Sequence, residues 1–458
     1  MVSGTLVIRQ GRVVDAFGMD CVCDVEISNG LVSNIGESIP QNGKEINAAG
    51  KFVIPGLVDT HVHVAGSARG YYMLARAGVT TALDMMGETD AFFKGFESAP
   101  TGLNVAYLYP LIPERTVSSA APSAQEITQV IEKALQGGAI GIKIVGGHYP
   151  LTPEATALCI EICAAKKCWC AVHAGTTENG SNLDGLKELV DFAGSNPVHI
   201  AHVNSYCRGD VLGDPVAEAV EAIKLIKDVD NYVAESYLAD INGCSGRLNE
   251  KGEPVSNVTR RCLEKGGFRA NAQGMKNAIE AGWAKVHGLS GKEIVLLSPE
   301  KGVKYFQKSR GKIMLSFPVN SAAAQIAIAL AKTENTEYIV QALSTDGGNI
   351  PRNCTLEKGL SLVKFGAFSI HDFIRKACWN PAVMLGLQGR KGAVKVGFDA
   401  DIAIVDPVAF KAQTVLSRGI IVFDSGEFYE SKNSLIISKE HTNFNKYNAL
   451  CVSPSWLR

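Results

Sequence analysis

No stretch of this 458-residue sequence is long and apolar enough for a membrane-spanning helix, which needs roughly 18 apolar residues. The opening segment, MVSGTLVIRQGRVVDAFG, lacks the basic region, the long apolar core and the small-residue cleavage site of a secretory signal. An excess of charge is also missing, since 45 lysines and arginines stand against 46 acidic residues. No net field therefore favours nucleic acid or an anionic membrane surface. We expect a cytoplasmic protein whose partner is a small molecule.

A disulfide framework and a cysteine metal cluster are also not expected. Such frameworks are typical of short secreted chains, whereas the twelve cysteines here are scattered through apolar segments. In the densest group, Cys159 and Cys163 lie one helical turn apart, and Cys168 and Cys170 share one strand face. That spacing is not a recognised zinc pattern. We interpret the cysteines as reduced core residues, because free cysteine behaves as a small buried hydrophobe.

Two patterns divide the chain. Residues 1–55 hold short apolar segments separated by polar turns, which predicts strands and little helix. From residue 56, apolar strands alternate with helical stretches, the pattern of parallel βα units. Short strand patterns return near the C-terminal end. We therefore expect residues 1–55 and 386–458 to form one composite β-sandwich beside a domain of residues 56–385.

Eight apolar segments are expected to be the parallel strands of this central domain: GLVDTHVHV, VTTALDM, NVAYLYP, IGIKIVG, CWCAVHA, VHIAHVN, YVAESYL and QALSTDG. Between them, SAQEITQVIEKALQ begins with a serine cap followed three residues later by glutamate, and PEATALCIEICAAKK has proline in its first turn. Eight such units predict an α/β fold of the TIM (β/α)8 barrel type. The segment of about residues 238–340 is too long for a simple connection, so we expect an insertion of extra helices and loops over the barrel mouth.

His61 and His63 in DTHVHV are two residues apart on the first strand, so both rings point to the same face. They lie near the C-terminal end of the strand, where barrel enzymes keep their active sites. A histidine pair alone is equally well explained as the polar end of a strand. The preceding residues, FVIPGLVDTHVHV, favour a functional pair.

The segment PGLVDTHVHV resembles the amidohydrolase superfamily, and GAIGIKIVGGHYPLTPEATALCIEICAAKKCWCAVHAGT is similar to parts of ureases, hydantoinases and dihydroorotases. In that superfamily the barrel supplies a lysine from the fourth strand, one histidine each from the fifth and sixth, and an aspartate from the eighth. The counterparts here are Lys143, His173, His202 and Asp346. His199 shares the sixth strand but departs from the ligand position.

The resemblance implies two divalent metal ions, with Lys143 carrying a carboxylate that bridges them. The implied ligands are His61, His63, Lys143, His173, His202 and Asp346. Nitrogen and oxygen ligands suit zinc first, with manganese, iron, cobalt and nickel left open. Lys143 faces the barrel between apolar neighbours, where a lone ammonium is costly; a structural salt bridge is the other explanation for it.

The expected reaction is hydrolysis of a C–N amide bond by a hydroxide held between the two metals, whose pKa would fall towards about 7. Asp346 is the expected base that takes the proton and delivers it to the leaving nitrogen. His148 or Tyr149 is expected to stabilise the oxyanion, as a tyrosine does in hydantoinases. Arg69 resembles the arginine with which dihydroorotases hold a carboxylate, although it is displaced along the loop, and a solvated surface role is the alternative. Position alone suggests four further substrate contacts: Asn204, Tyr206, Asn349 and Arg352.

A cyclic amide or imide, such as a hydantoin or dihydropyrimidine, is the favoured substrate. The spacing of His173 and His202 also resembles isoaspartyl dipeptidases and D-aminoacylases, so an N-acyl amino acid or a dipeptide is the alternative. Urease is disfavoured by the terminal β-domain and the long insertion before Asp346. A deaminase typically has a glutamate close after the fifth-strand histidine, where this chain has HAGTTE, and would leave Lys143 without a role. Retention of all six ligand positions argues against a non-catalytic scaffold, and the resemblance implies a dimer or tetramer.

Overall fold

All eight segments expected to be barrel strands are strands, and each pairs in parallel with the next along the chain. The structure, a computed structural model, describes residues 5–40, 43–227, 229, 231–309, 311–439 and 444–457. The barrel closes because β18 (Gly347–Gly348), which continues the eighth strand, pairs in parallel with the first. This arrangement confirms the TIM-barrel prediction. The eight strands are β6 (Leu57–His63), β7 (Val79–Asp84), β8 (Asn104–Leu111), β9 (Gly141–Val145), β10 (Trp169–His173), β11 (Val198–Ile200), β12 (Tyr232–Tyr237) and β17 (Ala342–Ser344).

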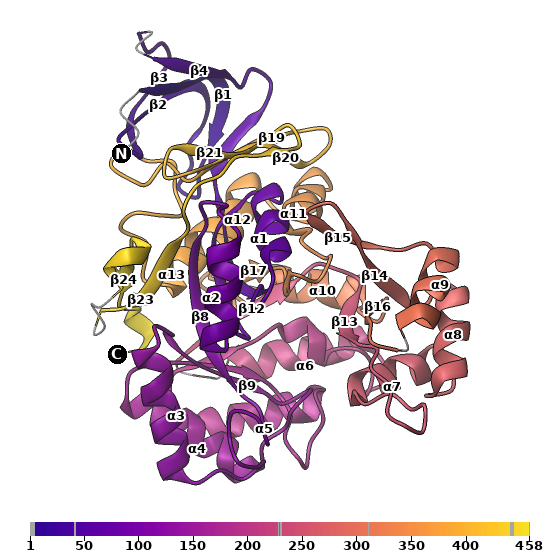
Figure 1. Cartoon of the computed structure of the whole chain (residues 1–458). Helices are drawn as coiled ribbons and strands as arrows, with labels where there is room; N and C mark the ends of the chain where they lie inside the picture. Colours follow the sequence, from indigo (N-terminus) through magenta and orange to yellow (C-terminus); the bar gives the residue numbers. More distant parts are fainter. Residues whose placement is uncertain are drawn as a thin grey trace.

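Helices follow the strands and cover the outside of the barrel (Figure 1). Two of them begin where the sequence predicts: Ser123 accepts a hydrogen bond from the backbone N–H of Glu126 at 3.2 Å, and Thr152 accepts one from Ala155 at 3.3 Å. The covering helices are α1 (Ala68–Arg76), α2 (Thr89–Ser98), α3 (Ala124–Gln136), α4 (Pro153–Ala165), α5 (Leu183–Ala193), α6 (Pro215–Lys227), α10 (Ala322–Leu330), α11 (Thr355–Lys364), α12 (Ile370–Ile374) and α13 (Asn380–Met384). Cys159, Cys163, Cys168 and Cys170 are free and buried between α4 and the barrel strands, as the composition predicts.

The two ends of the chain share one nine-stranded sheet at the top of Figure 1. β5 joins them, because it pairs in parallel with β1 and antiparallel with β19. The first strand, Leu6–Val14, pairs with β2 in a register that shifts between Ile8 and Gly11, and a side chain at Gly11 would clash with Val53. The sheet contains β1 (Leu6–Val14), β2 (Asp20–Ser28), β3 (Leu31–Gly36), β4 (Lys44–Asn47), β5 (Phe52–Pro55), β19 (Ile402–Asp406), β20 (Lys411–Ser417), β21 (Ile420–Asp424) and β22 (Glu427–Phe428).

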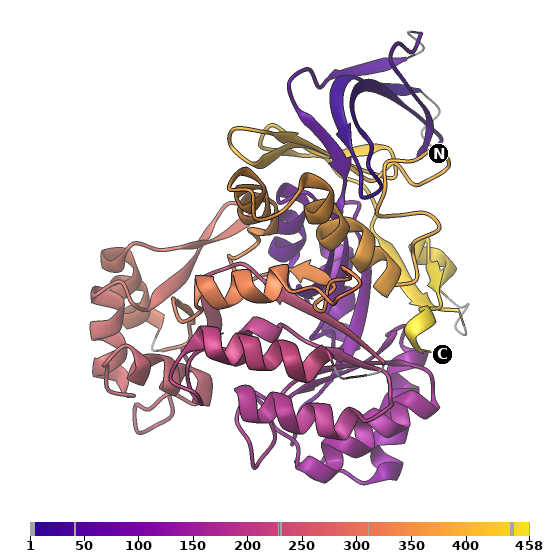
Figure 2. The ribbon, with the colours of Figure 1, turned by 180° about the vertical axis from the view of Figure 1, so that it is seen from behind.

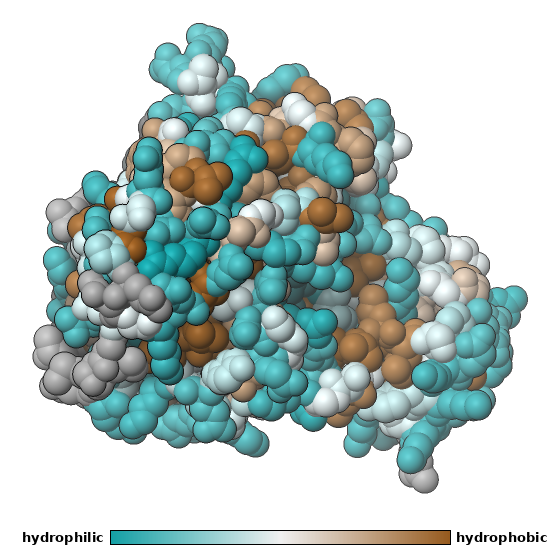
Figure 3. All heavy atoms as spheres, turned by 90° about the horizontal axis from the view of Figure 1, so that it is seen from above, coloured by the Kyte–Doolittle hydropathy of each residue, from teal (hydrophilic) through white to brown (hydrophobic). Residues whose placement is uncertain are grey.

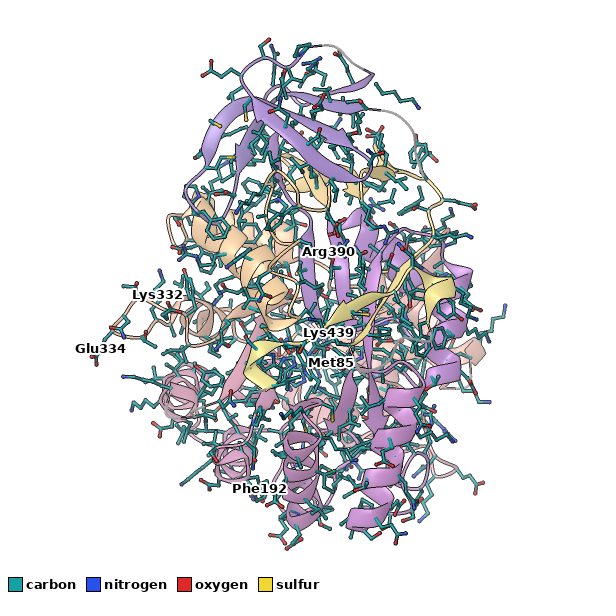
Figure 4. All side chains as sticks on the ribbon, turned by 90° about the vertical axis from the view of Figure 1, so that its left-hand side faces the viewer. Met85, Phe192, Lys332, Glu334, Arg390 and Lys439 are labelled. Carbon is teal, nitrogen blue, oxygen red and sulfur yellow. The ribbon has the colours of Figure 1, made fainter. Side chains whose placement is uncertain are left out.

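The last strands, β23 (Ser434–Ser438) and β24 (Leu450–Val452), lie elsewhere. β23 pairs in parallel with β8, so this part of the C-terminal segment extends the sheet of the barrel. Figure 4 shows Arg390 between the terminal sheet and the barrel, where it forms an ion pair with Asp399 at 2.8 Å. The predicted division into residues 1–55 with 386–458, and 56–385, stays a prediction.

The insertion contains a four-stranded antiparallel sheet in the order β13-β16-β14-β15, beside three helices. The expectation of helices and loops missed this sheet, whose strands are short. It has a core of its own, which includes Cys244, Leu263 and Phe317. Figure 2 shows that α10, inside the predicted range 238–340, packs beside α6 as an outer helix of the barrel. The insertion elements are β13 (Asn242–Ser245), α7 (Asn257–Lys265), α8 (Ala272–Glu280), β14 (Lys285–Ser290), β15 (Glu293–Leu296), α9 (Pro299–Ser309) and β16 (Met314–Phe317).

Among the helices that the structure describes, none has the length and hydrophobicity to cross a membrane.

Candidate metal centre and substrate cavity

A cavity of ≈ 1560 Å³ opens at the C-terminal ends of the barrel strands, with the insertion forming part of its wall. The six side chains expected to bind metal all line it: His61, His63, Lys143, His173, His202 and Asp346. They come from β6, β9, β10 and the segments that follow β11 and β17. The parallel strands therefore bring together residues that are almost 300 positions apart in the sequence, as expected for this edge of a TIM barrel.

His61, His63 and Asp346 form the first half of this cluster. The Nε2 atom of His63 lies 2.9 Å from Oδ1 of Asp346, and that of His61 lies 3.4 Å from the same oxygen. Asp346 has a left-handed backbone with φ 47°, a conformation that aspartate tolerates better than most residues. The three side chains offer ligand atoms within 4.8 Å of one another, so they form a possible metal site.

Lys143, His173 and His202 form the second half. Nε2 of His202 faces Nδ1 of His173 at 2.9 Å, a separation that suits two lone pairs directed at one cation. The Lys143 side chain is 2% exposed, and its Nζ has no hydrogen-bond partner among the described residues. Burial lowers the pKa of Lys143 to about 8, which increases the fraction of the side chain present as the neutral amine that can react with carbon dioxide. These residues therefore fit a metal centre with a carboxylated lysine.

Glu235 is a buried carboxylate behind the cluster that the sequence analysis missed. Its Oε1 accepts a hydrogen bond from Nδ1 of His61 at 2.6 Å and another from the backbone N–H of His202 at 2.7 Å. Its Oε2 accepts from Ser344 at 2.5 Å. Burial raises the pKa of Glu235, and His199, Ser344 and the backbone of His202 act against that rise. As a carboxylate, Glu235 only accepts, which assigns the proton to Nδ1 of His61 and leaves the lone pair of Nε2 for a metal. The signal was a glutamate within the otherwise uncharged strand YVAESYL.

A second contact orients the other pair of rings. Ser181 lies 2.7 Å from Nε2 of His173, which leaves Nδ1 of that ring facing His202. Burial holds the pKa of His61, His173 and His202 well below the ordinary value. All three imidazoles are therefore neutral at neutral pH, which is the form that binds metals.

Arg352 is the direct partner of Asp346. Its Nη2 lies 2.5 Å from Oδ2 of Asp346, and its guanidinium lies 4.7 Å from the centre of the Tyr237 ring. Burial alone would raise the pKa of Asp346, but Arg352 and the neighbouring histidines hold it well below its ordinary value. The carboxylate is thus available as a ligand and a base across the physiological pH range.

The expected substrate contacts divide into two groups. His148, Tyr149, Asn349 and Arg352 line the cavity. Arg69 and Asn204 are not on the wall that the described residues form, and their substrate roles stay predictions.

Three further residues have internal partners. Tyr206, also off the wall, accepts a hydrogen bond from the backbone N–H of Ala174 at 2.9 Å. Asn349 accepts one from Gly70 at 2.9 Å. His199 is fully buried and accepts a hydrogen bond from the Trp169 indole at 3.1 Å; its exclusion from the ligand set stays a prediction.

Comparison with known proteins identifies the family and similar enzymes. Residues 52–438 match the model of the family described as Amidohydrolase family. A dihydroorotase of Geobacter metallireducens is 23% identical over 432 residues, which cover 88% of this chain and 90% of that protein.

Two solved structures share the fold. N-acyl-D-glutamate deacylase from Bordetella bronchiseptica, complexed with zinc and a phosphonate inhibitor, aligns with a TM-score of 0.65 and 14% identity over 94% of this chain and 99% of that one. Dihydropyrimidinase from Brevibacillus agri aligns with a TM-score of 0.61 and 17% identity over 94% of this chain and 98% of that one.

The chain therefore belongs to the amidohydrolase family. It is a metal-dependent amide hydrolase that acts on carbon–nitrogen bonds, and His61, His63 and Asp346 form a possible metal site in it.

Proposed function

We propose that the enzyme hydrolyses an amide bond of a small molecule with two divalent metal ions, zinc first among them. His61, His63 and Asp346 would hold one ion, His173 and His202 the other, and carboxylated Lys143 would bridge the two. The observation that carries this proposal is the convergence of five potential ligands around a buried lysine amine that has no hydrogen-bond partner among the described residues. The dimer or tetramer and the cytoplasmic location expected from the sequence stay predictions.

Two ions bound here would supply a water nucleophile at neutral pH and polarise the scissile carbonyl. Asp346 then takes the proton of the attacking water and passes it to the leaving nitrogen. Arg352 keeps that carboxylate ionised and fixes its direction. Tyr149 or His148, on the cavity wall, donates a hydrogen bond to the oxyanion. Glu235 and Ser181 hold the imidazole rings in the orientation that ligation needs.

A cyclic amide or imide remains our first candidate for the substrate, in keeping with the dihydroorotase and dihydropyrimidinase to which the chain is similar. An N-acyl amino acid is the second. The cavity of ≈ 1560 Å³, above the range of about 300–1,000 Å³ usual for small-molecule sites, has room for this longer substrate. The likeness to N-acyl-D-glutamate deacylase supports the same choice at the level of fold.

The test combines a metal count with turnover. Purified protein is loaded with zinc in the presence of bicarbonate, the ions per chain are measured, and hydantoins, dihydropyrimidines and N-acyl amino acids of both hands are offered. We expect two ions per chain in the wild type, and loss of both metal and turnover in His61→Ala. His371→Asn is the matched control, because this histidine contacts the backbone of Asp15 far from the cavity. Full metal content in His61→Ala, or one ion per chain in the wild type, would contradict the proposal.

A further inference from the structure

The cavity wall carries more positive than negative side chains, unlike the chain as a whole. Eight lysines and arginines line the cavity against four carboxylates, whereas the complete sequence has a net charge of -1. Three of the eight are neutralised by an acidic neighbour: Arg115 by Glu88, Lys265 by Asp210 and Arg352 by Asp346. Besides Lys143, four cations on this wall have no carboxylate partner among the described residues: Arg208, Arg247, Arg261 and Lys312.

Arg208 differs from the other three because it is partly buried and held in place, whereas they are exposed. The short helix η1 (Val203–Tyr206) begins directly after His202, and Arg208 lies two residues beyond the end of this helix. Its Nε donates a hydrogen bond to Asn320 at 3.0 Å, and Asn320 in turn donates to the hydroxyl of Tyr237 at 3.2 Å. A guanidinium held on the wall that also carries the ligand side chains, without a carboxylate ion pair among the described residues, is suited to an anion of the substrate.

The insertion supplies an apolar part of the same wall. Leu289 on β14 is 60% exposed and Met314 on β16 is 43% exposed, although both line the cavity. Ile294 on β15 is partly exposed beside them. Figure 3 shows brown, hydrophobic atoms along a hollow beside the insertion. Apolar surface of this kind gains free energy when an apolar group of a ligand covers it.

We propose that the substrate is an amide that carries one carboxylate, which pairs with Arg208, and one apolar arm, which covers Leu289, Ile294 and Met314. This proposal rests on the proposed function, and it assigns the insertion the role of selecting the arm. A single planar guanidinium matches one carboxylate in a two-point contact. A phosphate dianion would need a second fixed cation, and the other unpaired cations of the wall are exposed.

The test compares matched acids and amides on the zinc-loaded enzyme. The substrates are N-acetyl-leucine, N-acetyl-leucinamide and N-acetyl-glycine, with both enantiomers of the chiral compounds. Each is assayed with the wild type, Arg208→Gln, Arg247→Gln and Leu289→Asn. We expect the wild type to prefer the acid over the amide by at least about 30-fold in kcat/KM, the effect of losing a desolvated charge pair. Arg208→Gln should abolish that preference by lowering kcat/KM for the acid to the level of the amide. Arg247→Gln, which removes an exposed charge from the same wall, should lower it less than about threefold.

Leu289→Asn should lower the preference for leucine over glycine and leave the acid-to-amide ratio unchanged. A wild type that does not distinguish the acid from the amide would overturn the proposal. An equal loss in Arg247→Gln and Arg208→Gln would also overturn it, because the effect would then be a general field.

Binding without turnover separates this proposal from the proposed function. Calorimetry measures the affinity of 4-methylpentanoate and its amide for the zinc-loaded wild type and Arg208→Gln, after equal metal content has been verified. If the wild type hydrolyses neither these amides nor the hydantoins and dihydropyrimidines, the proposed function fails, yet a preference for the acid that Arg208→Gln removes still supports the anchor. Acid binding that Arg208→Gln leaves unchanged would place the carboxylate on the metals and refute the anchor.

Discussion

Replacing Glu235 by glutamine tests whether this buried carboxylate sets the metal affinity. Glutamine has the same shape: its amide oxygen can accept from Nδ1 of His61 and from the backbone of His202, and its amide nitrogen can donate to the Ser344 hydroxyl. The change therefore removes the charge and keeps the hydrogen-bond geometry. A neutral hydrogen bond contributes about 1 kcal/mol, and a charge-assisted one about twice as much.

We expect the Glu235→Gln change to cost about 1–2 kcal/mol of metal binding, or roughly 5- to 30-fold in affinity, because His61 becomes a weaker ligand. The assay is a zinc titration against a chromophoric chelator at fixed pH. Glu218→Gln is the matched control, since Glu218 is also fully buried and accepts three backbone N–H groups, of Gly209, Val211 and Leu212. Zinc affinity within twofold of the wild type in Glu235→Gln, or an equal loss in both variants, would refute the reasoning.

Three further predictions concern the groups around the metals. Metal uptake by the apo-enzyme in bicarbonate, measured by metal count, should rise with pH with a midpoint near 8. Only the neutral amine of Lys143 reacts with carbon dioxide, and burial lowers the pKa of this amine to about 8. A midpoint near 10 would contradict this prediction. Asp346→Asn should keep much of the metal but lose several orders of magnitude in kcat, since an amide cannot accept the proton, and kcat within tenfold of wild type would remove this role. Arg352→Gln should raise the pKa of Asp346 and so move the acid limb of the kcat/KM profile to higher pH; a limb that stays or moves down would show that Arg352 does not hold this carboxylate ionised.

The barrel was predictable because its strands are short apolar runs bounded by glycine, proline and polar residues. A parallel strand that is buried on both faces has such a continuous apolar sequence, so its position can be predicted from the sequence. The spacing of His61 and His63 at a strand end suggested a functional pair, whereas Lys143, His173, His202 and Asp346 were placed by the resemblance to the amidohydrolase superfamily, and their metal-binding roles stay a prediction. Their convergence on one cavity needed only the rule that the C-terminal ends of the strands meet.

The rest depended on contacts that a linear pattern does not contain. The sheet of the insertion escaped notice because short strands acquire their partners from distant segments. Glu235 and Arg208 carry ordinary charges in the sequence, and only their neighbours distinguish them. Glu235 becomes significant through His61, 174 positions away, and Arg208 through Asn320, 112 positions away.

Carbon-13 NMR of enzyme loaded with zinc and labelled bicarbonate tests the carboxylated lysine most directly. We predict one protein-bound carbamate signal per chain that holds two zinc ions. Lys143→Ala should lose this signal and the affinity for both zinc ions, and acetate, but not methylamine, should partly restore zinc binding. A fully loaded, active wild type without the carbamate signal would contradict the two-metal account, as would rescue of Lys143→Ala by methylamine.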